Sequence, residues 1–184
     1  MDQSVIDRAK RGDREAFTTL VLTFGDRLYS VAYRILRDSS RAEDAVQQAF
    51  LTAWRELRHL RDNDRIEAWL YRLLVNACFA EVRHTRRWQP GLTLVSDLEV
   101  GPTTDDTQIT VAMRDELERA FRRLSAEQRA VLVMHHYLGF SGAEIGQVLG
   151  LSPGTVRSRL HYARQQTRAA IEADSRLVAT EFPA

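Results

Sequence analysis

The sequence of 184 residues has few of the residues that mark several classes of protein. It contains one cysteine, Cys78, so an internal disulfide framework is excluded and a reducing, cytoplasmic setting is expected. Cys78 lies in an apolar helical pattern, where we expect a buried structural thiol rather than a nucleophile. No apolar run approaches the length that crosses a bilayer, and the polar N-terminus does not resemble a signal peptide. We therefore expect no membrane insertion.

Lysine is nearly absent, since Lys10 is the one lysine among 26 basic residues. Arginine suits bidentate contacts with phosphate and guanine, although a GC-rich genome would produce the same bias. The charge is also uneven along the chain. Residues 88–113 contain four acidic residues and no basic one, whereas the segments on both sides are mildly basic. This pattern suggests two basic domains separated by an acidic segment.

Patterns typical of enzymes and metal sites are missing from the sequence. It has no glycine-rich phosphate loop, no CxxC pair and no nucleophile elbow. His135 and His136 are adjacent, so on a helix they would point in different directions and form a poor metal-binding pair. We expect a protein that is not an enzyme, with no catalytic residue, no metal and no cofactor.

Helical periodicity dominates what is present. Residues 14–36, 41–57 and 65–88 place apolar side chains three or four positions apart, which predicts long amphipathic helices, and residues 2–10 form a shorter candidate. Residues 90–110 contain Gly, Pro, Thr and Asp without periodicity, which is typical of a linker. The sequence thus predicts an all-α fold with two small helical domains. The first domain is a helical bundle (1–88) and the second is a helix-turn-helix domain (113–173). A flexible acidic linker (89–112) joins the two domains, and a disordered tail (174–184) follows the second.

The helix-turn-helix prediction rests on residues 124–167. Ser125 and Gln128 have the spacing of a capping box, Gly150 would end the middle helix, and Ser152 followed by proline would begin the last one. The residues expected to pack inward from that last helix are Val156, Leu160 and Ala163. Its other face is basic and polar, which suits a helix lying in the major groove of DNA. An ordinary helical hairpin with solvated arginines fits the same pattern.

Four stretches together resemble the extracytoplasmic-function (ECF) group of bacterial RNA polymerase sigma factors. They are EAFTTLVLTFGDRLYSVAYRIL at 15–36, AEDAVQQAFLTAW at 42–54, EAWLYRLLVNACFAEVRHTRR at 67–87 and the helix-turn-helix at 124–164. The resemblance implies a non-catalytic subunit that binds core RNA polymerase and promoter DNA, often under the control of an anti-sigma factor. The N-terminal domain would read and help to melt the −10 element, and the C-terminal domain would read the −35 element.

The resemblance also assigns three sets of site residues. The set expected to contact core polymerase is Asp44, Gln47, Gln48 and Leu51. The set expected to capture an unstacked −10 base and hold its phosphates is Arg61, Asn63, Arg65, Asn76, Phe79, Arg83, Arg86 and Arg87. The set expected to read the −35 element is Thr155, Arg157, Ser158, Arg159, His161, Tyr162 and Arg164.

The chain departs from the family pattern at several positions. Gln48 stands where many relatives have an acid, and Tyr162 where many have arginine. Gly142 and Gly146 replace commoner tyrosine and alanine, and each interior glycine is expected to destabilise its helix by about 0.5–1 kcal/mol relative to alanine. The middle helix is therefore expected to be loosely held. Trp69 is expected in the core rather than against a base.

Two other functions fit parts of the sequence. A stand-alone helix-turn-helix transcription regulator would explain the C-terminal third but would give no role to residues 42–54 or to the loop HLRDND at 59–64. A polymerase-binding decoy would explain the N-terminal domain without promoter reading. Loss of the roles of Arg157 and Asn76 would distinguish the decoy.

Overall fold

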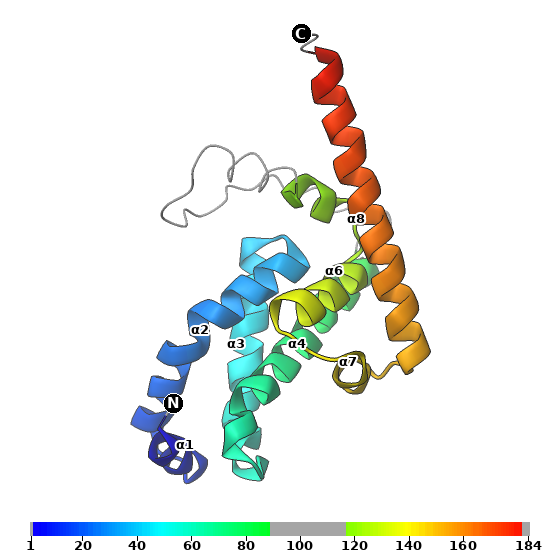
Figure 1. The fold of residues 1–184 in the computed structure, drawn as a ribbon. Helices are drawn as coiled ribbons and strands as arrows, with labels where there is room; N and C mark the ends of the chain where they lie inside the picture. Colours follow the sequence, from blue (N-terminus) through cyan, green and yellow to red (C-terminus); the bar gives the residue numbers. More distant parts are fainter. Residues whose placement is uncertain (1, 89–116, 182–184) are drawn as a thin grey trace. The chain divides into compact units, whose positions relative to one another are not determined.

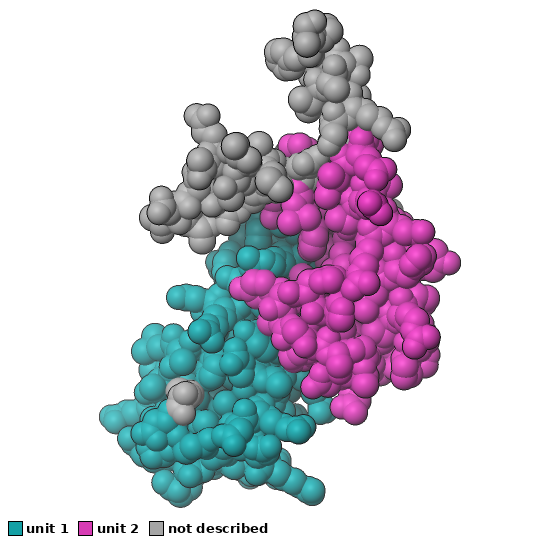
Figure 2. Space-filling view, viewed as in Figure 1, with its two compact units in different colours: residues 1–92 teal, residues 93–184 magenta. Residues whose placement is uncertain are grey.

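This computed structural model describes residues 2–88 and 117–181, with residues 85–88 and 174–181 described by their backbone alone. Within these ranges the chain forms helices and turns and contains no strand. It divides into two compact units, Met1–Leu92 and Thr93–Ala184 (Figure 2). The prediction of an all-α chain with two helical domains is therefore confirmed. The predicted linker at 89–112 lies outside the described residues.

Unit 1 is built from long helices joined by tight turns (Figure 1). In chain order its elements are α1 (Gln3–Lys10), α2 (Arg14–Leu36), α3 (Ser39–Glu56), η1 (Leu57–His59), η2 (Asn63–Arg65) and α4 (Ile66–Trp88). Helix α3 packs against both α2 and α4, α2 also packs against α4, and α1 packs against α2 and η1. The helices predicted from periodicity are confirmed, with ends that agree to within two residues.

The core of unit 1 combines large side chains with a stripe of alanines. Helix α2 buries large apolar residues such as Leu28 and Ile35, whereas the buried stripe of α3 consists mostly of alanine. Small side chains let α3 approach both neighbours closely, so the large residues of α2 and α4 fill the space between the helices. Cys78 of α4 is fully buried, and its burial raises the pKa of the thiol to about 12. The prediction of a structural thiol is confirmed.

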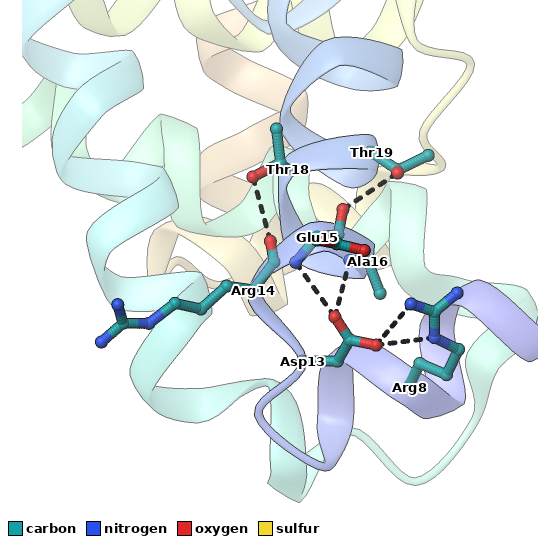
Figure 3. A network of polar contacts seen from close by, with 7 residues as sticks. All are labelled: Arg8, Asp13, Arg14, Glu15, Ala16, Thr18 and Thr19. Carbon is teal, nitrogen blue, oxygen red and sulfur yellow. Dashed lines mark hydrogen bonds and ion pairs between the residues drawn. The ribbon is translucent and has the colours of Figure 1, made fainter.

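Asp13 joins α1 to α2 (Figure 3). Its carboxylate caps α2 by accepting hydrogen bonds from the backbone N–H groups of Glu15 (3.0 Å) and Ala16 (3.2 Å), and Arg8 of α1 donates to its other oxygen at 2.6 Å. The hydrogen bond from Ala16, followed by the one from Arg8, lowers the pKa of Asp13 below its ordinary value. The helix cap and the ion pair thus hold α1 against the start of α2.

Unit 2 begins with a helical segment at residues 117–122. It continues with α6 (Ala126–Leu132), the π-helix η3 (Val133–Tyr137), α7 (Gly142–Leu149) and α8 (Pro153–Glu181), and both α6 and α7 pack against α8. The predicted capping box of Ser125 and Gln128 is confirmed, and so is Gly150 as a left-handed helix end with φ 64°. A second capping box, formed by Ser141 and Glu144, starts α7. Its spacing is visible in the sequence, although this cap was not among those predicted.

Arg129 is a buried arginine in α6 that has a structural role. It is 8% exposed and donates a hydrogen bond of 2.7 Å to the backbone oxygen of Leu124, in the turn that precedes α6. A carbonyl at the end of a helical segment carries partial negative charge, which favours a cation there. Arg129 therefore links the 117–122 segment to α6 and is set apart from the exposed arginines of α8.

Helix α8 continues to Glu181, beyond residue 173 where the sequence predicted the end of the helix-turn-helix domain. No glycine or proline occurs between Gly154 and Pro183, and the intervening residues are rich in good helix formers, which explains the continuation. None of the helices in the described parts of the chain combines the length and the apolar character needed to cross a membrane.

Candidate functional site

Helix α8 has one buried and one exposed face, as predicted. Val156, Leu160 and Ala163 are buried on the side that faces the rest of unit 2, where α6 and α7 pack against α8. The residues exposed on the other side are Arg157, Ser158, His161, Tyr162 and Arg164. Tyr162 is a large aromatic side chain that is 60% exposed, and its ring lies edge-to-face with that of His161 at 5.8 Å between centroids. Thr155 and Arg159 are half-buried at the edge of this face.

The hydroxyl groups at the start of α8 already have partners. The Oγ of Ser152 accepts from the backbone N–H of Thr155 at 3.2 Å and lies 2.9 Å from the Oγ1 of Thr155. The Oγ of Ser158 donates to the backbone oxygen of Thr155 at 3.0 Å. These contacts hold the first turn of the helix in place. Arg157, His161 and Tyr162 therefore form the centre of the exposed face.

The end of this face is connected to η3. The Nε–H of Arg164 donates to the Nε2 of His136 at 3.2 Å, which requires that nitrogen to be unprotonated. His135 has a different partner, because its Nδ1 lies 3.0 Å from the backbone oxygen of Phe140. Burial, then Arg164, then His135 lower the pKa of His136 below its ordinary value of 6.5. The contact between Arg164 and His136 thus depends on a neutral imidazole.

We expect acid to weaken the hold of η3 on α8. Because the pKa of His136 is lower in the folded chain, the unfolded chain takes up the proton first, so stability falls as the pH falls below about 6.5. Hydrogen exchange of the α8 amides, expressed as protection factors relative to the unfolded chain at each pH, should show lower protection at pH 5 than at pH 7.5. His136→Gln keeps an acceptor that does not titrate, and it should reduce this difference. An equal change in both proteins would exclude His136 as its source.

In unit 1, the residues expected at the −10 element form two groups. On α4, Asn76 and Arg83 are exposed, and Phe79 is half-buried between them. Arg72 is exposed one turn before Asn76, so it extends this face. Arg72 was not predicted as a site residue, although its i, i+4 spacing to Asn76 is visible in the sequence. Trp69, expected in the core, is half-buried.

The second group is the turn before α4, about 15 Å from Asn76 along the helix axis. Arg61 is exposed, and Arg65 is 81% exposed with its Nε 3.4 Å from the Oδ2 of Asp62. The amide of Asn63 is held by α1, since Lys10 donates to its Oδ1 at 2.9 Å and its Nδ2 donates to Asp7 at 2.8 Å. Arg86 and Arg87 belong to α4, but their side chains lie outside the described part of the structure.

A groove with an apolar floor runs between α2 and α3. Its lining residues are Phe17, Val21, Gly25, Asp26, Tyr29, Glu43, Asp44, Val46, Gln47, Phe50, Leu51 and Trp54. The expected polymerase-binding residues Asp44, Gln47 and Leu51 therefore share one surface. Gln48 is exposed and lies on the same helix, where its Nε2 is 3.4 Å from the Oγ1 of Thr52.

Helix α2 supplies a wall of this groove, although its periodicity predicted only a core-facing stripe. Phe17 packs edge-to-face on Trp54 with ring centroids 4.9 Å apart, and Trp54 is 40% exposed although it continues the apolar stripe of α3. Periodicity predicts the apolar side of a helix, while the packing of neighbouring helices decides how much of that side is covered. Leu51 is 47% exposed beside it.

Two family models match the chain. Residues 20–88 match Sigma-70 region 2, and residues 114–166 match Sigma-70, region 4. The first match contains most of α2, all of α3 and α4, and the turn between them. The second contains α6, α7 and the exposed face of α8. Helix α1 lies outside both matches.

Relatives of known identity match over most of their length. The chain is 35% identical over 153 residues to the ECF RNA polymerase sigma factor SigM of Mycobacterium tuberculosis, covering 83% of this chain and 76% of that protein. It is 28% identical over 173 residues to the ECF RNA polymerase sigma factor SigW of Bacillus subtilis, covering 89% of this chain and 92% of that protein.

Solved structures show the same fold. The sigma factor RpoE in complex with the anti-sigma factor NepR from Bartonella quintana matches with a TM-score of 0.68 and 23% identity, over 86% of this chain and 98% of that one. The structure of CnrH in complex with the cytosolic domain of CnrY matches with a TM-score of 0.60 and 27% identity, over 94% of this chain and 98% of that one.

Proposed function

The chain belongs to the ECF group of RNA polymerase sigma factors, and we propose that it binds core RNA polymerase through unit 1 and directs it to promoters with both units. Sigma factors are transcription initiation factors rather than enzymes. The observation that carries the proposal is the presence of region 2 and region 4 in one chain, since a stand-alone regulator would need region 4 alone. A protein that acts on DNA-bound polymerase is expected in the cytoplasm.

Unit 2 contacts the −35 element through the exposed face of α8. Arg157 lies one turn into the helix, where side chains reach base edges when a recognition helix enters the major groove. A guanidinium can bond guanine bidentately, whereas the engaged hydroxyls of Thr155 and Ser158 suit phosphate or water contacts. Tyr162 stands where relatives often have arginine, and its exposed ring suits apolar contact with a thymine methyl group.

Unit 1 contacts the −10 element through the turn at residues 60–65 and the exposed face of α4. Base capture requires a polar group for the base edge and a surface for stacking. Asn76 with Phe79 supplies both on α4, and Asn63 supplies a second amide in the turn. The exposed arginines Arg61, Arg72 and Arg83 suit the phosphates that flank the captured base.

The groove between α2 and α3 binds core polymerase. Its apolar centre, with Leu51 and Trp54 partly exposed, has the composition of an interface core, and the carboxylates of Asp26, Glu43 and Asp44 form an acidic edge. Such a surface fits a partner with an apolar centre and a basic edge. Gln48 adds a neutral amide where relatives often have an acid, so the edge attracts a basic partner less strongly than in those relatives.

An anti-sigma factor controls the protein in this proposal. The support comes from CnrH, which is 27% identical to this chain and whose structure is a complex with the cytosolic domain of CnrY. RpoE, with the same fold, is in complex with the anti-sigma factor NepR. Pull-down of the full chain with proteins encoded beside its gene tests this control directly.

Promoter selection by the assembled holoenzyme tests the two DNA contacts. We expect Arg157→Ala and Asn76→Ala each to lower transcription from selected promoters by about 5- to 150-fold, the effect of losing a bidentate base contact of about 1–3 kcal/mol. Binding to core polymerase should be unchanged in both variants. Arg168→Ala, which removes the same guanidinium from an exposed position of α8 outside the matched residues 114–166, is the matched control for Arg157→Ala.

Two results would contradict the proposal. Binding of the isolated chain to palindromic duplex DNA without any affinity for core polymerase would favour the stand-alone regulator. Tight binding to core polymerase with no promoter selection by the wild-type chain would favour the decoy.

A further inference from the structure

Helix α1 lies outside the region 2 match, yet one of its faces contacts the turn that precedes α4. Gln3, Asp7 and Lys10 are spaced i, i+4 and i+7, so they lie on one side of the helix. All three bond residues of η2, since the Nε2 of Gln3 donates to the Oδ1 of Asp64 and the other two bond Asn63. The adjacent side of α1 buries Ile6 and Ala9 in the fold. Helix α1 is thus a fixed support for the turn.

The two partners of Asn63 have opposite charges, and this difference fixes the orientation of its side-chain amide. The ammonium group of Lys10 donates to the Oδ1 of Asn63 at 2.9 Å, and the Nδ2 of Asn63 donates to the Oδ1 of Asp7 at 2.8 Å. A rotated amide would place its NH₂ group against the ammonium and its oxygen against the carboxylate, so both contacts would become repulsive. Lys10 and Asp7 therefore allow one of the two amide orientations.

A held amide still has hydrogen-bonding capacity. An asparagine side chain has two N–H donors and two acceptor lone pairs, and α1 uses one of each. One donor and one acceptor remain, in a fixed order, at a half-buried side chain. An unstacked base presents donors and acceptors on its edge in an order that depends on the base. A freely rotating amide can match either order, whereas a fixed amide matches one.

The surroundings of Asn63 suit a base edge better than a phosphate. The polar recess around it is lined by Gln3, Asp7 and Lys10 of α1 and by residues 61–64. This lining carries the three carboxylates of Asp7, Asp62 and Asp64 against the two cations of Lys10 and Arg61. A net negative recess repels phosphate, but it places no such penalty on a neutral base.

We propose that Asp7 and Lys10 are specificity-determining positioning residues, which fix the amide of Asn63 so that it selects one base of the −10 element. This inference rests on the proposed function, because it needs the turn at 60–65 to meet an unstacked promoter base. Helix α1 is thereby part of the recognition site although it lies outside the family match.

The test is in vitro transcription by the assembled holoenzyme from a promoter pool with a randomised −10 element. We expect Lys10→Met and Asp7→Leu each to lower the base preference at one position by about 5- to 150-fold, the discrimination of a bidentate amide contact. Asn63→Ala should lower the preference at the same position. Lys10→Arg keeps a cationic donor and should retain most of the preference.

Arg11→Met is the matched control, since it removes the same charge from an exposed residue next to Lys10. The double variant Lys10→Met/Asn63→Ala should lose no more preference than Asn63→Ala alone, because Lys10 acts through Asn63. Circular dichroism on each variant shows whether unit 1 keeps its helices, and Asp7→Leu serves as the test if Lys10→Met does not keep them.

The outcomes separate this inference from the proposed function. An equal loss of transcription from all promoter sequences in Lys10→Met would show that Lys10 touches DNA directly and would overturn the inference. Additive losses of base preference in the double variant would do the same. Unchanged base preference in folded Lys10→Met and Asp7→Leu would overturn it as well. Absence of any −10 preference in the wild-type holoenzyme would instead contradict the proposed function.

Discussion

Replacement of Leu51 by aspartate is expected to weaken binding to core RNA polymerase by about 30- to 1000-fold, which corresponds to the loss of about 2–4 kcal/mol at an interface hot spot. Leu51 lies in the groove between α2 and α3 beside Trp54, and both side chains are partly exposed in the unbound chain. A carboxylate there would be buried without a partner when an apolar surface covers the groove. Titration of labelled chain with core polymerase measures the effect.

The chain offers a matched control for this substitution. Leu22 of α2 is 78% exposed and does not line the groove, so Leu22→Asp makes the same chemical change outside the proposed interface. Both positions are exposed enough to accept aspartate without disturbing the core, and circular dichroism should show unchanged helix content. Equal losses of affinity in the two variants would show that the interface is not centred on the groove.

Gly146→Ala is expected to destabilise unit 2 by about 1–3 kcal/mol, the range for overpacking a well-packed site. A Cβ atom added at Gly146 would lie 2.8 Å from the backbone oxygen of Leu151, and backbone cannot move aside as a side-chain end can. The same two residues are joined by a hydrogen bond of 2.9 Å from the N–H of Leu151 to the oxygen of Gly146. Gly146 is therefore required by the close approach between α7 and the turn that leads to α8.

Gly142→Ala provides the contrast within the same helix. Its added Cβ would lie 3.9 Å from the Cγ1 of Val156, an ordinary contact, so we expect a gain of about 0.4–1 kcal/mol from the reduced entropy of the unfolded chain. Hydrogen exchange of the α7 and α8 amides in the full-length chain measures both changes. A stabilising effect of Gly146→Ala would contradict the close approach between Gly146 and Leu151.

These two glycines show where sequence reasoning was insufficient. From composition alone, both were expected to loosen α7 through their low helix propensity. The structure distinguishes them. A Cβ atom added at Gly142 would make an ordinary van der Waals contact, whereas one added at Gly146 would lie too close to the backbone oxygen of Leu151, five residues later in the chain. Propensity describes a residue within its own helix and contains no information on which other backbone segment comes close to it.

Asn63 and Trp54 illustrate the same limit at the proposed sites. The sequence identified Asn63 as a polar group in a loop, but its two partners on α1 are 53 and 56 positions away in the chain. Trp54 fitted the apolar stripe of α3, yet the groove beside α2 leaves it partly exposed. Arg72 was missed although its spacing from Asn76 is local, so in that case the sequence did contain the signal.

The sequence by itself determined the helices, their caps and the family, because these depend on periodicity, on residues within one turn and on motifs with fixed spacing. It also determined which side of α8 is buried, since Val156, Leu160 and Ala163 share one helical face. The tertiary structure alone decided that α1 supports the turn at Asn63, that α2 completes the groove and that Gly146 lies against Leu151. Each of these depends on contacts between separate elements, and such contacts are set by the packing of whole helices rather than by any local pattern.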